Sequence, residues 1–261
     1  MKKLFVLVFF SSYFLFAQDI DSIGTLPSVE SQAYHEYRLK NSIPFYNLSK
    51  IQNMVSKLEP VPVDPEMAAE GDIVDYYVSL SDKDFNKLSD KEKFTYTMIH
   101  PEYMSQVCAD EMTILDEDKK IFGYLCPTFD ESSWSERQRS FLNSNRKVVI
   151  NLIKEISLKD QHIGLNCKMA LEEINATEII PFLVDFYNTK GKKDRDILTL
   201  LLTLVKNNKY YPFTRSNVYR ELYGDDKSYY DSYIEYTELN EEYIIKSAKN
   251  FYVKLYNSRT F

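Results

Sequence analysis

The stretch from His100 to Cys108 contains residue types that could carry out nucleophilic chemistry. A cysteine protease or transferase uses a thiolate as nucleophile, a histidine that takes the thiol proton, and a third group that orients the histidine. Cys108 and His100 could fill the first two roles, with Glu102 or Glu111 as the orienting carboxylate. Such partners normally come from distant parts of a chain, and no family-specific signature surrounds this cysteine. We therefore predict no catalytic residue outright and keep a cysteine-dependent hydrolase or transferase as an alternative hypothesis.

Aromatic residues form a second group of candidates. The chain has 21 tyrosines, of which Tyr229, Tyr233 and Tyr236 would share one face of a helix. Tyrosine rings give contact area at a small entropic cost, so these residues and the single tryptophan, Trp134, are the candidates for binding a peptide or a glycan. The same rings could instead complete the core at the end of a helical domain, and the sequence favours that interpretation.

Metal and cofactor sites are not predicted. The three histidines, His35, His100 and His162, do not have the spacing that a zinc-binding helix requires. An acidic cluster precedes Lys119 and consists of Asp110, Glu111, Asp116, Glu117 and Asp118. It lacks the alternating ligands and the central glycine of a calcium loop. Because acids are favourable at the start of a helix, we interpret the cluster as a solvated helix start.

The three cysteines limit how many disulfides the chain can form. Cys108, Cys126 and Cys167 allow at most one internal disulfide, which leaves one thiol over. Cys108 and Cys126 are closest in sequence, and we predict that they form the disulfide. Closing this loop would stabilise the fold by about 3 kcal/mol on the chain-entropy model.

The first residues predict export. Lys2 and Lys3 precede an apolar and small-residue run from Leu4 to Phe16, and Ala17 follows it. A basic start, a short apolar stretch and a small residue at its end are typical of a secretory signal peptide. We therefore expect a signal peptide over residues 1–17 and an exported mature protein without a transmembrane segment. Its location would be the periplasm if the source is Gram-negative, and otherwise outside the cell.

Composition excludes some classes of function. The formal net charge is −7 and the pI is near 5.2, whereas nucleic-acid binding depends on clustered Lys and Arg. The chain has only six glycines, and their spacing gives neither a P-loop nor a dinucleotide-binding fingerprint. Scarce glycine also favours helices over β-sandwiches and barrels, which use glycine in turns and bulges.

Helix patterns divide the chain into two parts. Residues 18–65 are predicted to form an arm with a short helix near Val29–Leu39, an amphipathic helix over Phe45–Glu59 and a proline-rich linker. Residues 66–261 are predicted to form an all-α domain. In that domain Ser89–Glu92 and Ser133–Glu136 read as capping boxes, and the second would open a helix that reaches Ile156. The segment from Ile73 to Leu80 is expected to be a loop or a short strand.

The most informative internal pattern is a repeat with a period of 31 residues. Leu171 matches Leu202, Ile174 matches Val205, and the pair Pro181-Phe182 matches Pro212-Phe213. A helix, a short turn and a proline in the first turn of a second helix make a helical hairpin. Over about residues 165–223 the chain resembles HEAT-type helical repeats. That resemblance implies a superhelical stack of hairpins whose surface binds or scaffolds other proteins.

These observations lead to one leading hypothesis. We expect an all-α fold with a HEAT-like helical-hairpin core and a flexible N-terminal arm. The expected function is non-catalytic binding or adaptor activity on another envelope or secreted protein. The cysteine-dependent enzyme and the tyrosine-based peptide- or glycan-binding protein remain the alternatives.

Overall fold

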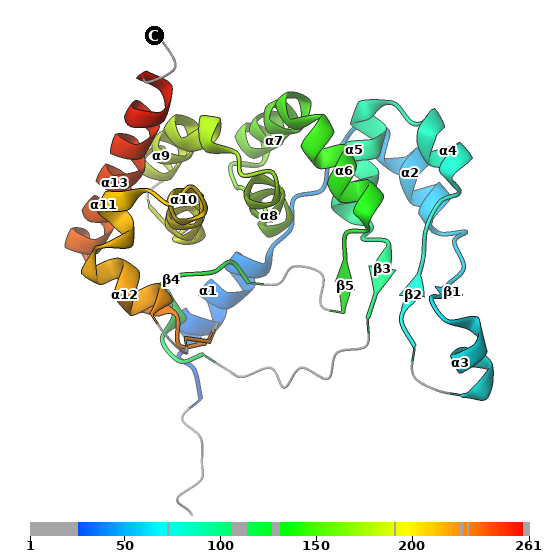
Figure 1. Ribbon diagram of the computed structural model, residues 1–261, viewed down its shortest axis with the longest axis horizontal. Helices are drawn as coiled ribbons and strands as arrows, with labels where there is room; N and C mark the ends of the chain where they lie inside the picture. Colours follow the sequence, from blue (N-terminus) through cyan, green and yellow to red (C-terminus); the bar gives the residue numbers. More distant parts are fainter. Residues whose placement is uncertain are drawn as a thin grey trace, which may run out of the picture.

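The computed structural model describes residues 26–71, 74–105, 114–126, 131–190, 192–224, 227–228 and 230–257. These residues form mostly helices, with two small antiparallel sheets (Figure 1). The fold is therefore mostly α rather than all-α. The predicted signal peptide, Cys108, Glu111 and Tyr229 lie outside the described residues.

Helices gather at one end of the molecule and the larger sheet lies at the other (Figure 1). The helical end contains α8 (Leu165–Glu173), α9 (Ile180–Thr189), α10 (Asp196–Asn207), α11 (Tyr211–Thr214), α12 (Asn217–Tyr223) and α13 (Glu238–Asn257). The sheet end contains α2 (Leu48–Val55), α3 (Pro65–Glu70), α4 (Asp82–Lys87) and α5 (Asp90–Ile99). Between the two ends lie α1 (Val29–Leu39), α6 (Glu136–Ser144) and α7 (Arg146–Asp160).

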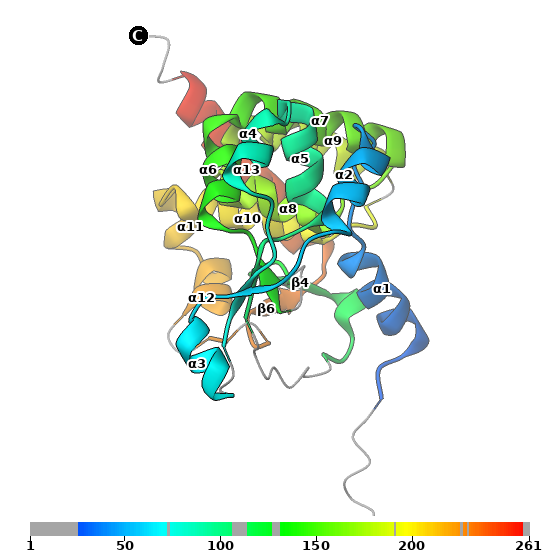
Figure 2. The same ribbon diagram turned by 90° about the vertical axis from the view of Figure 1, so that its right-hand side faces the viewer.

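The strands are only two or three residues long. The larger sheet has the order β1-β2-β3-β5, with β1 Val61–Pro62, β2 Tyr76–Tyr77, β3 Tyr103–Met104 and β5 Ser132–Ser133. A second sheet pairs β4 (Lys120–Phe122) with β6 (Tyr233–Glu235). Figure 2 shows the larger sheet and α3 projecting below α4 and α5. The segment predicted as a linker thus supplies β1 and the start of α3, and the expected short strand near Tyr76 is present.

Helix starts follow the capping chemistry with one correction. Ser89 and Glu92 form the predicted capping box at the start of α5. The second box is not at Ser133, because Ser133 is paired with Tyr103 in the sheet and its backbone is extended. The N-cap is Ser135, whose partner is Gln138. The helix predicted to reach Ile156 is divided at Asn145 into α6 and α7.

The repeat consists of two helical hairpins of unequal spacing. Pro181 and Pro212, 31 positions apart, both lie in the first turn of a helix, as predicted. The turns before them contain Asn175 and Lys209, two residues with positive φ that are 34 positions apart. The three-residue difference equals the length of the 3₁₀-helix η2 (Thr177–Ile179), which the first unit has between its turn and its proline helix.

Helix α10 is the centre of the core. Every residue from Asp196 to Val205 is buried, and the helix packs against α8, α9, α13 and β4. A helix buried on all sides needs no charged face, and before Lys206 its only polar residues are Asp196, which pairs with Arg38, and the buried Thr199 and Thr203. Among the described helices, none is both long enough and apolar enough to cross a membrane.

The N-terminal segment packs onto the helical domain. Arg38 of α1 is only 1% exposed. In the segment that follows α1, the carbonyl of Lys40 accepts a backbone hydrogen bond from Leu165, and the backbone N–H of Ser42 donates one to Asn166 Oδ1. A Cβ at Gly164 would collide with the backbone of Ser42, so glycine permits this close approach. The expected flexibility of the arm therefore does not apply to α1 and the segment that follows it.

Candidate functional site

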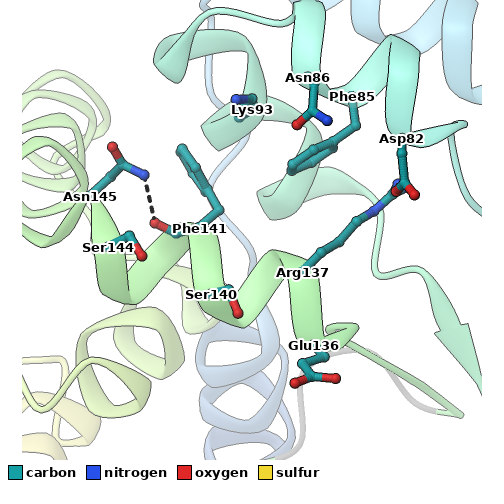
Figure 3. A pocket seen from close by; sticks show the side chains of 10 residues that line it. All are labelled: Asp82, Phe85, Asn86, Lys93, Glu136, Arg137, Ser140, Phe141, Ser144 and Asn145. Carbon is teal, nitrogen blue, oxygen red and sulfur yellow. Dashed lines mark hydrogen bonds and ion pairs between the residues drawn. The ribbon is translucent and has the colours of Figure 1, made fainter.

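A groove of about 470 Å³ lies between α4, α5 and α6 (Figure 3). The three helices contribute unequal shares of its lining: α6 provides most of one wall, α4 the opposite wall, and α5 a single lysine. The lining residues are Asp82, Phe85, Asn86, Lys93, Glu136, Arg137, Ser140, Phe141, Ser144 and Asn145.

Helix α6 presents its lining residues at helical spacing. Arg137, Ser140, Phe141 and Ser144 are three or four positions apart, so they lie along one face. The Ser135 cap fixes where this helix begins and therefore which face meets the groove. At the far end, Asn145 donates a hydrogen bond of 3.0 Å to the carbonyl of Phe141, as drawn in Figure 3.

A buried carboxylate lies directly behind the groove. Glu102 is 1% exposed, and its oxygens accept hydrogen bonds from Tyr96 Oη at 2.7 Å and from Ser135 Oγ at 2.5 Å. Its backbone N–H donates to Oε1 of Gln138, the residue that completes the Ser135 capping box. A buried charge of this kind is tolerated only when it is paired and hydrogen-bonded.

Arg137 supplies that pairing and also reaches the groove. Its Nε donates to both oxygens of Glu102, at 3.0 and 2.9 Å, and Nη2 donates to the carbonyl of Leu80 at 2.6 Å. Its Nη1 donates to Asp82 at 2.8 Å. The guanidinium lies 4.7 Å from the ring centroid of Phe85, and the side chain is 24% exposed. The contact with Glu102 therefore fixes a guanidinium at the edge of an open groove.

The remaining rim is polar and mostly uncharged. Asn86, Ser140 and Ser144 are exposed, and no hydrogen bond joins their side chains to another described residue. Lys93 places its ammonium 5.4 Å from the ring centroid of Phe85. Uncharged donors and acceptors beside two cations and the carboxylates of Asp82 and Glu136 suit a ligand that carries amide groups, such as a peptide.

The structure describes two residues of the predicted catalytic set, His100 and Glu102. His100 caps the C-terminus of α5, and its Nε2 donates to the carbonyl of Val78 at 2.6 Å. Burial lowers the pKa of His100. Glu102 accepts from Tyr96, Ser135 and Arg137, and no hydrogen bond joins it to His100 in the described structure. Cys108 and Glu111 fall outside the described residues, so the dyad stays a hypothesis.

The predicted aromatic residues are held by the protein itself. Trp134 is 7% exposed and donates its indole N–H to the carbonyl of Thr97 at 2.9 Å. Tyr233 belongs to strand β6 and not to a helix, so it cannot share a helical face with Tyr236. Tyr236 donates to Glu241 at 2.7 Å, and the guanidinium of Arg195 lies 4.0 Å from its ring centroid. Whether Tyr233, Tyr236 and Trp134 bind a ligand stays a prediction.

Two of the three cysteines lie within the described residues. Cys167 is buried, and burial raises the pKa of its thiol to about 12. Cys126 is half-buried, and its predicted disulfide with Cys108 involves a residue outside the described ranges. Among the described residues, no group of three or more His, Cys, Asp or Glu side chains could hold a metal ion.

One member of the acidic cluster is not solvated as expected. Glu117 is 3% exposed, and its carboxylate accepts from His35 Nδ1 at 2.9 Å and from Arg38 Nη1 at 3.0 Å. Asp116 does face solvent, where it pairs with Lys119. The buried residue follows a turn in which Asp116 has positive φ, and this turn directs Glu117 toward α1.

The groove residues themselves were not singled out by the sequence. Polar residues on short helices look like an ordinary solvated face, and only a Ser-x-x-Gln capping box around Arg137 could have drawn attention to this position.

Comparisons with protein families, with curated proteins and with solved structures found no match to this chain.

Proposed function

We propose that this chain is an exported, non-catalytic binding or adaptor protein that acts on another envelope or secreted protein, and that the groove between α4, α5 and α6 receives a peptide segment of that partner. The observation that carries the proposal is the fixed position of Arg137. Four acceptor oxygens, two on Glu102 and one each on Leu80 and Asp82, hold its guanidinium in place before any ligand arrives. Preorganisation of this kind reduces the entropy that binding would otherwise cost.

The lining gives each part of a peptide a complementary group. Main-chain amides can pair with the side chains of Asn86, Ser140 and Ser144, which are exposed and uncharged. A carboxylate of the peptide can approach Lys93 and the exposed edge of Arg137.

The helical hairpins at the other end are consistent with this proposal. We infer that α8–α13 form a short HEAT-like stack, for which the matching prolines and turns of the two units give support. Repeats of this kind serve as scaffolds and binding surfaces, and here they would hold the groove helices through α7 and α8.

The test is site-specific photo-cross-linking in the native envelope. A photoreactive phenylalanine analogue replaces Ser140, which lines the groove, or Asn151, an exposed residue of α7 outside it. We expect one dominant partner protein to be captured from position 140 and not from position 151. Ser140→Tyr should block the captured partner in a binding assay, whereas Asn151→Tyr should not.

Two outcomes would contradict the proposal. Equal capture from both positions would show that the groove has no special role, and equal affinity of the two tyrosine variants would place the contact elsewhere. Because both substitutions are at exposed helical positions and change helix propensity little, thermal melting of each variant checks that the fold is intact.

A further inference from the structure

A second surface is distinguished by its charge. Residues 59–82 contain seven acidic side chains and no Lys, Arg or His. The whole chain has 39 acidic residues and 32 Lys and Arg, so the rest of the chain contains 32 of each and is formally neutral. The entire formal net charge therefore lies in one segment of 24 residues. The acids are Glu59, Asp64, Glu66, Glu70, Asp72, Asp75 and Asp82.

The described part of this segment projects from the molecule. We call it the acidic lobe and define it as residues 59–71 and 74–77, which contain β1, α3 and β2. It lies at the sheet end in Figure 1 and below the helices in Figure 2. Strand β3 completes its sheet, with Tyr77 paired to Tyr103. Among the described residues of these four elements no basic side chain occurs.

The acids of the lobe are mostly unneutralised. Glu59, Glu66 and Glu70 are exposed and take part in no ion pair within the described structure. Asp64 caps α3 by accepting from the backbone N–H groups of Glu66 and Met67. Self-repulsion between uncompensated like charges is unfavourable for folding alone, so a partner that neutralises them gains energy that the isolated protein does not have.

The acidic lobe also exposes a row of apolar side chains. Val61 is 59% exposed and Tyr77 is 41% exposed. The register pairs Val61 with Tyr77 and Tyr77 with Tyr103, and directly opposed residues of neighbouring strands point to the same face. The rings of Tyr77 and Tyr103 meet edge to face, with centroids 5.3 Å apart. Val63 and Met67, at 50% and 44% exposure, extend the apolar surface toward α3.

The outer edge of this sheet does not favour strand addition. Pro62 lies on the edge strand β1 and has no backbone N–H to offer to another chain. A partner must therefore bind through its side chains. Apolar groups that are exposed together and rimmed by charge of one sign mark an interaction site for a partner with apolar groups and the opposite charge.

From this combination we propose that the acidic lobe docks a cationic segment of a partner protein, in which lysine or arginine side chains alternate with apolar ones. The apolar side chains of that segment cover Val61, Val63 and Met67. Its cations approach Glu66 and Glu70, and one of them lies over the exposed ring of Tyr77. The surface is separate from the groove, so the proposal is independent of the one made above.

The probe is a fluorescein-labelled peptide of alternating lysine and valine, titrated with the full chain and followed by fluorescence anisotropy. Two further peptides replace either lysine by glutamate or valine by serine. The test variant is Glu66→Gln/Glu70→Gln in α3. The matched control is Glu238→Gln/Glu242→Gln, which removes the same charge from exposed positions of α13. Tyr77→Ser tests the aromatic contact.

We expect the lysine–valine peptide to bind and the other two to bind more weakly. The α3 double variant should weaken binding about threefold to tenfold, whereas the α13 variant should change it less than about twofold. Tyr77→Ser should weaken it by about threefold or more. Equal weakening by the two double variants would mean that only net charge matters, and it would overturn the proposal. So would undiminished binding of the glutamate–valine peptide, or undiminished affinity of a folded Tyr77→Ser variant.

Discussion

Arg38 and Arg137 are both held by buried carboxylates, yet one contact is closed to solvent and the other borders a groove. Arg38 donates from Nε to both oxygens of Asp196, at 3.0 and 3.2 Å, and from Nη1 to Glu117. Its side chain is 1% exposed and lies 4.1 Å from the ring centroid of Phe122. The side chain of Arg137 is 24% exposed, although its partner Glu102 is as buried as Asp196.

The difference in exposure distinguishes an arginine that only stabilises the fold from one that a ligand can also reach. Arg38 lies 158 positions from Asp196 and 79 from Glu117, so this contact joins three distant segments and leaves no surface for a ligand. Burying such ions is costly and is repaid only while every partner remains in place. Arg137 has the same anchoring on one side, but its other side faces the groove, where water or a ligand can take part.

Replacing Arg38 should have the largest effect. Arg38→Ala leaves the carboxylates of Asp196 and Glu117 buried without their cation, and we expect the free energy of unfolding to fall by about 3–5 kcal/mol. Urea denaturation measures this change. Arg139→Ala is the matched control, because Arg139 is exposed and should matter by less than about 0.5 kcal/mol. A loss below about 1 kcal/mol for Arg38→Ala would show that the closed contact is not an anchor.

His162 should make the free energy of unfolding sensitive to acid. Burial, followed by the charge of Lys168, lowers the pKa of His162 to about 4, and its Nδ1 has no hydrogen-bond partner among the described residues. The unfolded chain takes up the proton near pH 6.5 and the folded protein only near pH 4, so unfolding is favoured as the pH falls through this window. The stability lost by pH 4 is on the order of 3 kcal/mol.

The measurement is urea denaturation of the wild type and His162→Gln at several pH values. Glu92 also responds to acid, because its bonds to Lys50 and Ser89 lower its pKa to about 2. Its stabilising contribution is present above the unfolded value of 4.5 and is lost between 4.5 and 2. Above pH 4.5 the slope comes from the buried histidines, because burial also lowers the pKa of His100. The difference in slope between the wild type and His162→Gln isolates the part of His162, and the variant should have the smaller slope. An identical slope in the two proteins would contradict the assignment.

Arg137→Ala should cost less than Arg38→Ala. Glu102 keeps its hydrogen bonds from Tyr96 and Ser135, and water can enter from the groove to solvate the freed carboxylate. We expect a loss of about 1–3 kcal/mol in urea denaturation. Lys93→Ala, which removes the other groove cation without exposing a buried charge, should change stability little. If Arg137→Ala were as destabilising as Arg38→Ala, the distinction between the two contacts would fail.

Local chemistry made part of this fold predictable. The Ser89–Glu92 box and the prolines at 181 and 212 act through neighbours in the chain, and the structure has these helix starts where the sequence indicates them. Apart from β2, which lies in the segment expected to be a loop or a short strand, the strands were not predicted. Pairs such as Tyr103 with Ser133 form between residues far apart in the sequence, and a two-residue strand has too few residues for an alternating pattern. Glu117 and Arg38 look solvent-exposed in sequence, since charged residues usually are, and only tertiary packing buries them together.

The rate at which the Cys167 thiol is labelled should distinguish the two arginine contacts through local opening, the smallest of the effects that we predict. The thiol is buried and its pKa is raised to about 12 by that burial, so iodoacetamide should not modify it in the folded protein and should do so once urea unfolds the chain. In Arg38→Ala, labelling under native conditions should be about a hundredfold faster or more, because labelling requires opening and opening becomes easier by the lost free energy. Arg137→Ala should accelerate labelling only as far as its own loss of global stability allows.

If Arg38→Ala accelerates labelling by more than its loss of global stability, the chain opens locally beneath α1, and the contacts of Arg38 normally prevent that local opening. If both variants follow global stability alone, the closed side and the groove side unfold as one cooperative unit. Peptide mapping of the same samples also shows whether Cys108 and Cys126 are protected as the predicted disulfide.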